Sequence, residues 1–562
     1  MRLGGLILRP LPGGAVPSRR LMLSAAPTGH TLRPGLVPTP AIGAGTTPRP
    51  AAYPHPHLML ALIGAAVVVG LFVAWRFTID DAFITFRYAQ HLAHGQGLTW
   101  NPGQRVEGYT DFLWVMLLAG AATLGWPLPT IAKILGAGSL VALVALLLLF
   151  GRHHGGRLLR WWPAGCLLLT PATYYHAVSG LETLLYALLV FGLFLSVLRM
   201  ADHAATPSPG LAATLPFLGL AAGLTRPEGV LPAALAVIGA CCVAPGGVRR
   251  VLVVATASAL ALGAAYFAWR WSYFGWLLPN TFYAKVDGHG AGVVTVVGLL
   301  RTYLPFLLVI LLGWAAAPRS PVFRWGLAFL AAVVLPYAAF RPIMDFSGRF
   351  TYQSIPLLAA MSAVALGGLA RRGVFDHVWR AIPVGLLLAI TLATANYLPT
   401  DYGYHLRHGH VALGKALAAA PVPVAWRSLA VGDAGAIPYY SRWRAVDWAG
   451  LNDPAIAHGL PATRRILQES PTLVFVFSRD GVRPWDLPQP DVPTLLQRYE
   501  VGGAVEFHPH YYLLGLILRS APPDVRQTLT ATLSRVGATS AASNSGAGAA
   551  PWREMVASLP RW

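Results

Sequence analysis

The sequence predicts a polytopic α-helical membrane protein with about eleven transmembrane helices and a small C-terminal α/β domain on the extracytoplasmic side. Hydrophobic residues make up 55% of the 562 residues and charged residues only 11%, whereas soluble domains carry about 25% charged residues. Apolar runs long enough to cross about 30 Å of hydrocarbon recur between residues 58 and 398. Beyond residue 399 acidic residues and short β-type runs return, which indicates a folded domain outside the bilayer.

Residues 1–56 form a basic tail that is rich in Pro, Gly, Ala and Arg and contains no acidic residue. A segment of this composition buries too little apolar surface to fold, so we expect it to be disordered. Its arginines favour a cytoplasmic location.

Residues 57–398 form the predicted transmembrane domain. A further apolar stretch, 109–125, is tightly bounded by Gly108 and Trp126-Pro127. We therefore interpret it as a helix at the membrane surface, within a first external loop of residues 76–129. The predicted spans lie near 58–75, 130–150, 163–178, 181–200, 211–224, 230–245, 251–271, 302–317, 323–340, 352–370 and 380–398.

The distribution of arginine supports this count of spans. With the tail inside, the loops that contain Arg152, Arg199, Arg249, Arg319 and Arg371 all fall inside, as the positive-inside rule requires. A twelfth span at 109–125 would move each of these loops outside. The net charge of +20 is then a consequence of topology, and no nucleic-acid partner is expected.

The C-terminal part of the chain has the pattern of a small α/β domain, residues 399–536. The run Leu473–Phe477 alternates Val and Phe like a buried strand, and a helix-like stretch, Thr463–Glu469, precedes it. A segment rich in Ser, Ala and Gly follows, so we predict a linker and tail at 537–562.

Two adjacent carboxylates, Asp80 and Asp81, lie just beyond the first span. Asp80 can cap the helix that follows, with Asp81 in its first turn, where acids favour the helix dipole. The alternative is a general base or a divalent-cation ligand at the membrane surface, because burial there raises the pKa of a carboxyl group. Arg87 lies two turns further on and is a candidate substrate ligand or a structural partner.

The other polar clusters fall on the same side of the membrane as Asp80 and Asp81. Ionisable residues at a membrane are costly and usually functional, so their convergence predicts one site. The cations suit an anionic phosphate beside a hydroxyl acceptor, although Arg226 can also simply pair with Glu182 or Glu228. We predict donor-phosphate ligands at Arg226, Lys285, Arg341 and Arg349, and further substrate contacts at Glu107, Tyr109, Thr110, Glu182, Glu228, Asn280 and Tyr283.

Several other classes of site are excluded. The three cysteines, Cys166, Cys241 and Cys242, lie in apolar runs, so a disulfide scaffold is not expected. The sequence has no Walker A motif, no His-Glu-x-x-His zinc motif and no Gly-x-Ser-x-Gly elbow.

The first loop resembles that of the GT-C glycosyltransferases, which use polyprenyl-phosphate sugars. The resemblance is carried by Asp80-Asp81-Ala82-Phe83-Ile84 with Arg87-Tyr88, and by Asn101-Pro102-Gly103 through Arg105-Val106-Glu107-Gly108-Tyr109-Thr110. Within this superfamily the chain is most similar to the branch of terminal β-(1→2)-arabinofuranosyltransferases. Leu224–Gly229, Leu278–Lys285 and Gly432-Asp433-Ala434-Gly435 also resemble that branch.

The resemblance implies a GT-C fold in the plasma (inner) membrane of a bacterium. It implies a cytoplasmic N-terminus and an active site at the outer leaflet. It also implies transfer of a sugar, arabinofuranose, from a polyprenyl phosphate to an extracytoplasmic glycan or glycoprotein, with inversion. By this resemblance Asp80 is the catalytic base, with Asp81 in support or on a metal ion.

Two alternatives remain open at this stage. The same scaffold suits a hexosyltransferase, for example one for mannose. A lipid-linked sugar flippase or transporter would use the basic cleft for binding alone, although such proteins often show internal repeats and none is evident here.

Overall fold

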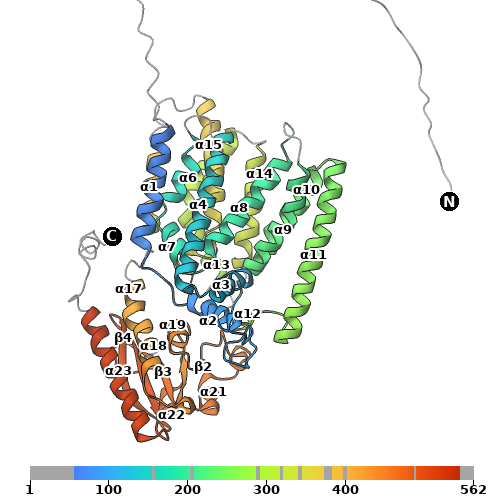
Figure 1. Ribbon diagram of the computed structural model, residues 1–562. Coiled ribbons are helices and arrows are strands. Elements are labelled where there is room, and N and C mark those ends of the chain that lie inside the picture. The colour runs from blue at the N-terminus through green and yellow to red at the C-terminus, as the bar shows by residue number, and fades with distance from the viewer. Residues whose placement is uncertain are drawn as a thin grey trace, which may run out of the picture. The chain divides into compact units, whose positions relative to one another are not determined.

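The computed structural model describes residues 56–154, 159–202, 208–285, 291–316, 320–338, 345–372, 382–395, 402–485 and 489–544. They belong to one compact unit, His55–Trp562. The predicted disordered tail lies outside the described residues, except for Pro56, which begins the first helix. Figure 1 shows a set of long helices with an α/β domain beyond one of their ends.

Helices form at each of the eleven predicted spans, and five of them are long and apolar enough to cross a membrane. In the most apolar stretch of α8 and of α15, 72% and 83% of the residues are buried, against 11% in α1 and 17% in α11. The first pair therefore forms the core of the bundle, while α1 and α11 present apolar side chains to the surroundings, as lipid-facing helices do. The helices are α1 (Pro56–Ala74), α4 (Leu128–His154), α6 (Trp162–Leu168), α7 (Ala172–Val178), α8 (Thr183–Met200), α9 (Pro209–Thr225), α10 (Val230–Val243), α11 (Gly246–Phe274), α13 (Ala291–Ala316), α14 (Pro321–Val334), α15 (Ser354–Arg371) and α16 (Ile382–Ala395).

The predicted span 163–178 is two short helices, α6 and α7, rather than one. Pro171 lacks a backbone N–H and disfavours helical geometry at Thr170 before it, so the helix stops there. The carbonyl groups near the break are satisfied by side chains, since Thr170 Oγ1 donates to Cys166 O and Thr173 Oγ1 to Leu167 O, both at 2.8 Å.

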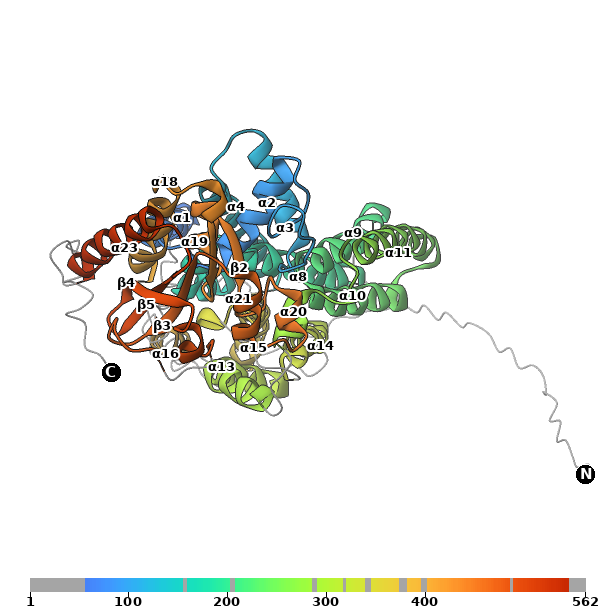
Figure 2. The same ribbon diagram turned by 90° about the horizontal axis from the view of Figure 1, so that it is seen from below.

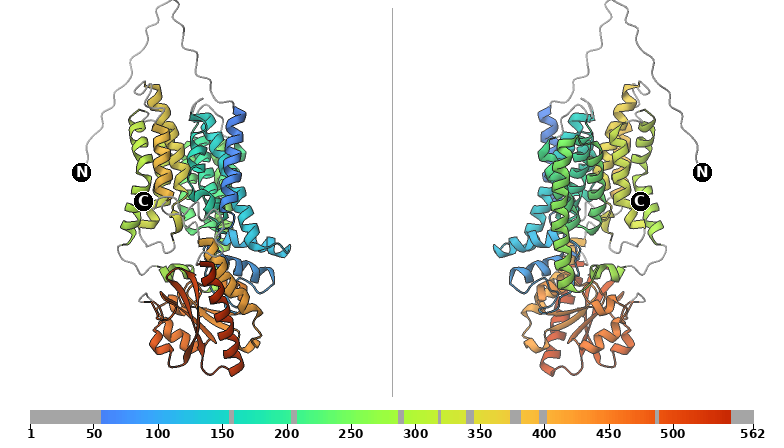
Figure 3. Two further views of the ribbon diagram at one scale, coloured as in Figure 1. Left: turned by 90° about the vertical axis from the view of Figure 1, so that its left-hand side faces the viewer. Right: turned by 90° about the vertical axis from the view of Figure 1, so that its right-hand side faces the viewer.

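The first loop carries two helices, α2 (Ala82–Ala93) and α3 (Phe112–Thr123). Helix α3 has 12 residues, a length of about 18 Å that cannot cross the hydrocarbon. The prediction that 109–125 is not a full span therefore agrees with the helix length. Figure 3 shows α2 and α3 beside the junction between the long helices and the α/β domain.

The C-terminal domain, described from Tyr402 to Asn544, is built on one five-stranded sheet in the order β2-β1-β3-β5-β4. Strand β1 pairs in parallel with β2 and β3, whereas β5 pairs antiparallel with β3 and β4. The predicted α/β character is confirmed, and Figure 2 views this domain end-on. The strands are β1 (Ser428–Val431), β2 (Arg444–Asp447), β3 (Leu473–Ser478), β4 (Tyr499–His508) and β5 (Tyr511–Leu518).

Short helices complete the described structure. They are α12 (Asn280–Lys285), α17 (Tyr402–Leu406), α18 (Ala412–Ala419), α19 (Ala436–Ser441), α20 (Pro454–Ala457), α21 (Ala462–Glu469) and α22 (Val492–Leu495). Single turns occur at η1 (Pro227–Gly229), η2 (Leu335–Ala338), η3 (Phe346–Gly348), η5 (Arg407–Val411) and η6 (Val424–Trp426).

The predicted linker begins inside a helix. Helix α23 (Pro523–Asn544) continues past residue 536 and buries Val525, Leu529, Leu533 and Val536 along one face. The Ser- and Ala-rich composition that suggested a linker is compatible with helix, because Ala has the highest helix propensity. The rest of the predicted tail, from residue 545, lies outside the described residues.

Candidate active site

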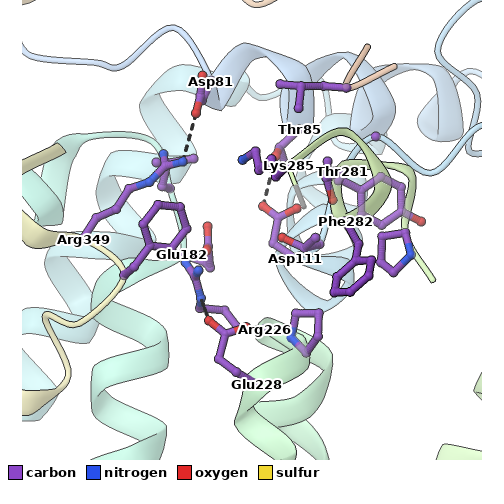
Figure 4. Close-up of a pocket in the computed structure, with 18 of the residues that line it drawn as sticks. Asp81, Thr85, Asp111, Glu182, Arg226, Glu228, Thr281, Phe282, Lys285 and Arg349 are labelled. Atoms are coloured by element: carbon purple, nitrogen blue, oxygen red, sulfur yellow. Dashed lines mark hydrogen bonds and ion pairs between the residues drawn. The ribbon is translucent and has the colours of Figure 1, made fainter. Parts of the chain in front are cut away.

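A cavity of about 470 Å³ opens where the long helices meet the first loop and the C-terminal domain. Figure 4 shows its polar side chains, which come from the first loop and from the ends of several helices far apart in sequence. Its polar and charged lining residues include Asp81, Thr85, Tyr109, Thr110, Asp111, Glu182, Arg226, Glu228, Thr281, Lys285, Tyr337 and Arg349.

The cavity brings together most of the residues selected from the sequence. Predicted residues that line it are Asp81, Tyr109, Thr110, Glu182, Arg226, Glu228, Lys285 and Arg349. Predicted residues outside its lining are Asp80, Arg87, Glu107, Asn280 and Tyr283. Arg341 lies outside the described residues.

Asp81 and Arg349 form an ion pair across one wall of the cavity. Arg349 Nη2 lies 3.0 Å from Asp81 Oδ2, as drawn in Figure 4. This pair occupies one oxygen of the carboxylate and leaves Oδ1 without a hydrogen bond among the described residues. Nε of Arg349 is also buried with no partner in the described structure.

Arg226 is held by two carboxylates. Its Nη1 lies 2.8 Å from Glu182 Oε1 and its Nε 2.5 Å from Glu228 Oε1. Tyr337 Oη donates a further hydrogen bond to Glu228. A buried arginine that is neutralised in this way has little positive charge left for a ligand. The contacts of Arg226 therefore favour the alternative in which it pairs with Glu182 and Glu228 and does not bind the donor phosphate.

Lys285, at the end of α12, differs from Arg226 because no hydrogen bond or ion pair occupies it among the described residues. Burial, together with the positive charge of the nearby Arg349, lowers the pKa of its ammonium group to about 8. Its Nζ lies 5.9 Å from the ring centre of Phe350, and the guanidinium carbon of Arg349 lies 4.7 Å from the same ring. The two cations therefore face one part of the cavity.

Asp111, which sequence reasoning missed, lies at the start of α3 and points into the cavity. Thr85 Oγ1 donates to its Oδ2 at 3.0 Å, while Oδ1 is buried without a partner among the described residues. Burial, with the negative charge of Glu182, raises the pKa of this carboxyl group to about 8. The sequence contained one signal for this residue, since Asp111 is an acid that directly precedes an apolar run of the first loop.

Four buried polar atoms in this cavity lack a hydrogen bond within the described structure. They are Tyr109 Oη, Asp111 Oδ1, Thr281 Oγ1 and Arg349 Nε. Buried polar groups are nearly always satisfied, so a concentration of unsatisfied ones in one cavity indicates a place for a polar ligand.

Asp80 faces away from the cavity toward the C-terminal domain. Its Oδ2 accepts from Gly435 N at 3.0 Å and its Oδ1 from Ala436 N at 2.8 Å, where α19 begins. A Cβ at position 435 would lie 2.0 Å from Asp80 O, so only glycine allows this approach. Burial raises the pKa of the Asp80 carboxyl group to about 6.

The remaining predicted residues hold the first loop and α12 in place. Arg87 donates to Trp443 O at 2.9 Å, and Arg270 Nη2 pairs with Glu107 at 2.5 Å. Asn280 Nδ2 donates to Gly450 O at 2.8 Å. The ring of Tyr283 packs against His458, with 4.5 Å between the ring centres.

The predicted cation site on Asp80 and Asp81 is not supported by their contacts, because Asp80 binds backbone N–H groups and Asp81 binds Arg349. Within the described ranges no group of three or more His, Cys, Asp or Glu side chains is placed to hold a metal ion.

Comparison with known proteins gives matches to both parts of the chain. A family described as a domain of unknown function (DUF8728) matches residues 403–530, in the C-terminal domain. The terminal β-(1→2)-arabinofuranosyltransferase of Mycobacterium tuberculosis is 32% identical over 291 residues, which cover 47% of this chain and 45% of that protein. The enzyme of the same name from Corynebacterium glutamicum is 29% identical over 254 residues, which cover 41% of this chain and 37% of that protein.

A solved structure shares the fold. The crystal structure of ArnT from Cupriavidus metallidurans bound to undecaprenyl phosphate aligns with a TM-score of 0.55 at 14% identity, covering 84% of this chain and all of ArnT (100%). The alignments with the two curated relatives span less than half the length of either one. The chain is therefore similar, over less than half of its length, to the terminal β-(1→2)-arabinofuranosyltransferases, and it has an ArnT-like fold.

Proposed function

We propose that this protein is a membrane glycosyltransferase that transfers arabinofuranose from a polyprenyl-phosphate donor to an extracytoplasmic glycan or glycoprotein. The observation that carries the proposal is the cavity in which unsatisfied polar atoms, a carboxylate and two cations meet at the end of the apolar helices. The homology to arabinofuranosyltransferases supports the sugar. The ArnT structure, which contains undecaprenyl phosphate, supports the class of donor.

The donor phosphate is bound by Lys285 and by Nε of Arg349. Both groups are near the Phe350 ring, and neither donor is occupied by a carboxylate among the described residues. A phosphate between them gains charge-assisted hydrogen bonds in a partly desolvated site. Arg226 has a different role, since Glu182 and Glu228 already neutralise it.

Asp81 is the general base. Its Oδ1 removes the proton from an acceptor hydroxyl, and the hydroxyl oxygen forms a bond with the anomeric carbon of the sugar. The bond from that carbon to the phosphate oxygen breaks, and the electron pair leaves with the polyprenyl phosphate. This single displacement inverts the anomeric carbon, and Lys285 with Arg349 stabilises the charge of the departing phosphate.

Asp111 is a neutral hydrogen-bond donor at neutral pH. The raised pKa keeps its carboxyl group protonated below about 8. Its unpartnered Oδ1 can therefore donate a proton in a hydrogen bond to a sugar hydroxyl or a phosphate oxygen. Asp80 acts indirectly, because its contacts to Gly435 and Ala436 hold α2 against the C-terminal domain.

The C-terminal domain lies at one end of the long helices (Figure 3). The cavity is at the same end, since Leu451 of that domain is among its lining residues. Together with the arginine pattern, this supports a multi-pass protein of a bacterial plasma membrane. Its N-terminus is cytoplasmic, and its active site and C-terminal domain are extracytoplasmic.

The test is an assay of the purified full chain in lipid nanodiscs with decaprenyl-phosphate arabinofuranose and, separately, decaprenyl-phosphate mannose. We expect release of decaprenyl phosphate and formation of a glycosidic bond from the arabinofuranose donor only. Turnover with the mannose donor alone would show that the protein transfers mannose and not arabinofuranose. In proteoliposomes, passage of the intact donor across the bilayer without bond formation would identify a transporter instead. A parallel reaction with EDTA tests whether transfer requires a divalent cation.

A further inference from the structure

A second cleft, of about 930 Å³, lies between the first loop and the C-terminal domain, apart from the active-site cavity. We call it the arginine cleft, because Arg87, Arg427, Arg442, Arg444 and Arg465 line it together with His91 and His94. No carboxylate is among its lining residues in the described structure. A cleft lined by one sign of charge concentrates ligands of the opposite sign.

Two of these arginines have carboxylate partners behind the cleft. Arg444 pairs with Glu469 and Arg465 pairs with Asp453, at 2.7 and 2.8 Å. Among the described residues, the side chain of Arg427 donates only to the backbone carbonyl of Val422, and Arg442 has no ion pair. The cleft therefore retains positive charge that the protein does not compensate.

Arg87 adds a buried cation to this surplus. The residue is 3% exposed, and its guanidinium donates to Trp100 O, Asn101 Oδ1, Pro438 O and Trp443 O, all of which are neutral acceptors. A buried charge without a counter-ion is costly, and an anion in the adjoining cleft would reduce that cost.

Arg442 occupies a backbone conformation that favours glycine. Its φ is +58° at the C-terminal end of α19. A non-glycine residue in this region carries a conformational penalty, and such residues concentrate at functional sites. Glycine at position 442 would avoid this penalty.

The neutral lining indicates a hydroxylated ligand rather than an acyl chain. The amides of Gln90, Gln96 and Gln104 face the cleft, and few apolar side chains do. Guanidinium groups bind carboxylates and phosphates in a fork geometry, while amides bind hydroxyl groups.

The cleft is within reach of the transfer site. Thr85 lines the active-site cavity and Arg87 lines the cleft, and residues two positions apart on a helix point about 160° apart. Along the helix axis Asp81 and His94 are about 20 Å apart. A glycan chain whose end lies at Asp81 can therefore extend around α2 into the cleft.

We infer that the arginine cleft binds an anionic segment of the acceptor glycan, one that carries carboxylate or phosphate groups beside its hydroxyl groups. The identification of this glycan as the acceptor depends on the proposed function. The presence of an anion-binding site does not depend on it.

The experiment measures binding without any donor, so that it is independent of catalysis. The full chain in zwitterionic nanodiscs is titrated with fluorescently labelled hexagalacturonic acid and with labelled maltohexaose, its neutral counterpart. We expect binding of the acidic hexasaccharide at least tenfold tighter than the neutral one, with affinity that falls as salt rises. Equal affinity for the two sugars would overturn the proposal.

Two variants locate the site. In Arg427→Gln/Arg442→Gly we expect at least a tenfold loss of hexagalacturonate binding, with a thermal midpoint no lower than that of the wild type, because glycine relieves the backbone at position 442. Arg498→Gln/Arg535→Gln, which removes two exposed arginines of the same domain outside the cleft, is the matched control and should bind normally. An equal loss of hexagalacturonate affinity in both variants would show a general effect of charge and contradict binding in the arginine cleft.

Two further outcomes separate this inference from the proposed function. If transfer of arabinofuranose occurs but the double variant leaves both hexagalacturonate binding and the KM for an acidic acceptor unchanged, the cleft is not the anionic site. If no transfer occurs with any donor while the cleft still binds hexagalacturonate, the anion site stands and the proposed function fails. Binding of phosphatidylglycerol vesicles that is lost in the double variant, with no binding of hexagalacturonate, would assign the cleft to lipid headgroups and overturn the proposal.

Discussion

The two adjacent aspartates at the start of α2 make different contacts. Asp81 lines the active-site cavity with one oxygen available, whereas both oxygens of Asp80 accept backbone N–H groups of the C-terminal domain. On the helix that follows them, neighbouring residues point about 100° apart, so adjacent acids can serve separate purposes.

We expect Asp81→Asn to lower kcat by about 10²–10⁴-fold, the usual contribution of a general base. Asparagine retains the shape of the side chain and can still accept a hydrogen bond from Arg349, so the thermal midpoint should fall only slightly. The affinity for decaprenyl phosphate should not weaken, because Arg349 loses its counter-charge. Steady-state kinetics and a melting curve on the same preparation measure both. A variant that keeps wild-type kcat would remove Asp81 from the chemistry.

We expect Asp80→Asn to lower the stability of the fold more than it lowers the chemical step. Asparagine can accept only one of the two backbone hydrogen bonds, so we expect the free energy of unfolding to fall by about 1–3 kcal/mol. The residual turnover should exceed that of Asp81→Asn. If instead Asp80→Asn abolishes turnover with an unchanged melting curve, Asp80 is the base that the resemblance of the first loop implies.

The lowered pKa of Lys285 predicts that donor binding depends on pH. The pKa of Lys285 is lowered to about 8, so the side chain is charged at pH 7 and loses its proton as the pH rises through that value. We expect the Kd for decaprenyl phosphate to increase between pH 7 and pH 9. Lys285→Arg should bind well and remove most of this dependence, because arginine stays charged. An identical pH profile in Lys285→Arg would point to another group.

Sequence reasoning identified residues by their type more reliably than by their orientation. Lys285, Arg349 and Asp81 were selected because charged residues near a membrane are costly, and they share one cavity. The sequence could not show that Asp80 reaches residues 435 and 436, because this contact joins positions more than 350 residues apart (|i−j| = 355 and 356). Asp111 escaped notice because a single acid before an apolar run resembles a helix cap, although its side chain makes no cap hydrogen bond.

At the scale of elements, long apolar runs predicted where the helices of the bundle form, and composition misled where it fits more than one kind of element. An apolar run does not distinguish one helix from two, and Pro171 divided 163–178 into α6 and α7. A Ser- and Ala-rich segment does not distinguish a linker from a helix that packs on a sheet. Leu533 and Val536 are buried in α23 just before the predicted linker, and this packing lets the helix continue to Asn544.

The start of α19 is the element that joins the C-terminal domain to the first loop. We expect Gly435→Ala to disrupt this joint, because the new Cβ would lie 2.0 Å from Asp80 O and 2.5 Å from its carboxyl group. Limited proteolysis should then cleave between the two parts faster than in the wild type. Gly138→Ala is the matched control, since nothing lies within 4 Å of a Cβ at that helical position. Equal protease resistance of the two variants would contradict this role of Gly435.

At the scale of the whole molecule, the exposed apolar surface of the outermost helices requires a surrounding membrane. Phe72 on α1 is 81% exposed, and each large apolar side chain left in water costs about 1.5–3 kcal/mol relative to burial. The lipid bilayer is therefore a structural partner of the bundle. Residues that the sequence assigned to one face of that bilayer, among them Glu182, Lys285 and Arg349, line a single cavity.

The proposed orientation in the membrane can be tested on spheroplasts. In a background with Cys166, Cys241 and Cys242 replaced by alanine, Val482→Cys places a thiol at an exposed position of the C-terminal domain. Gly247→Cys places one at the exposed start of α11, which the arginine pattern assigns to the cytoplasm. We expect a membrane-impermeant maleimide to label position 482 in intact spheroplasts, and position 247 only after lysis. The reverse pattern would place the active site in the cytoplasm and overturn the extracytoplasmic acceptor.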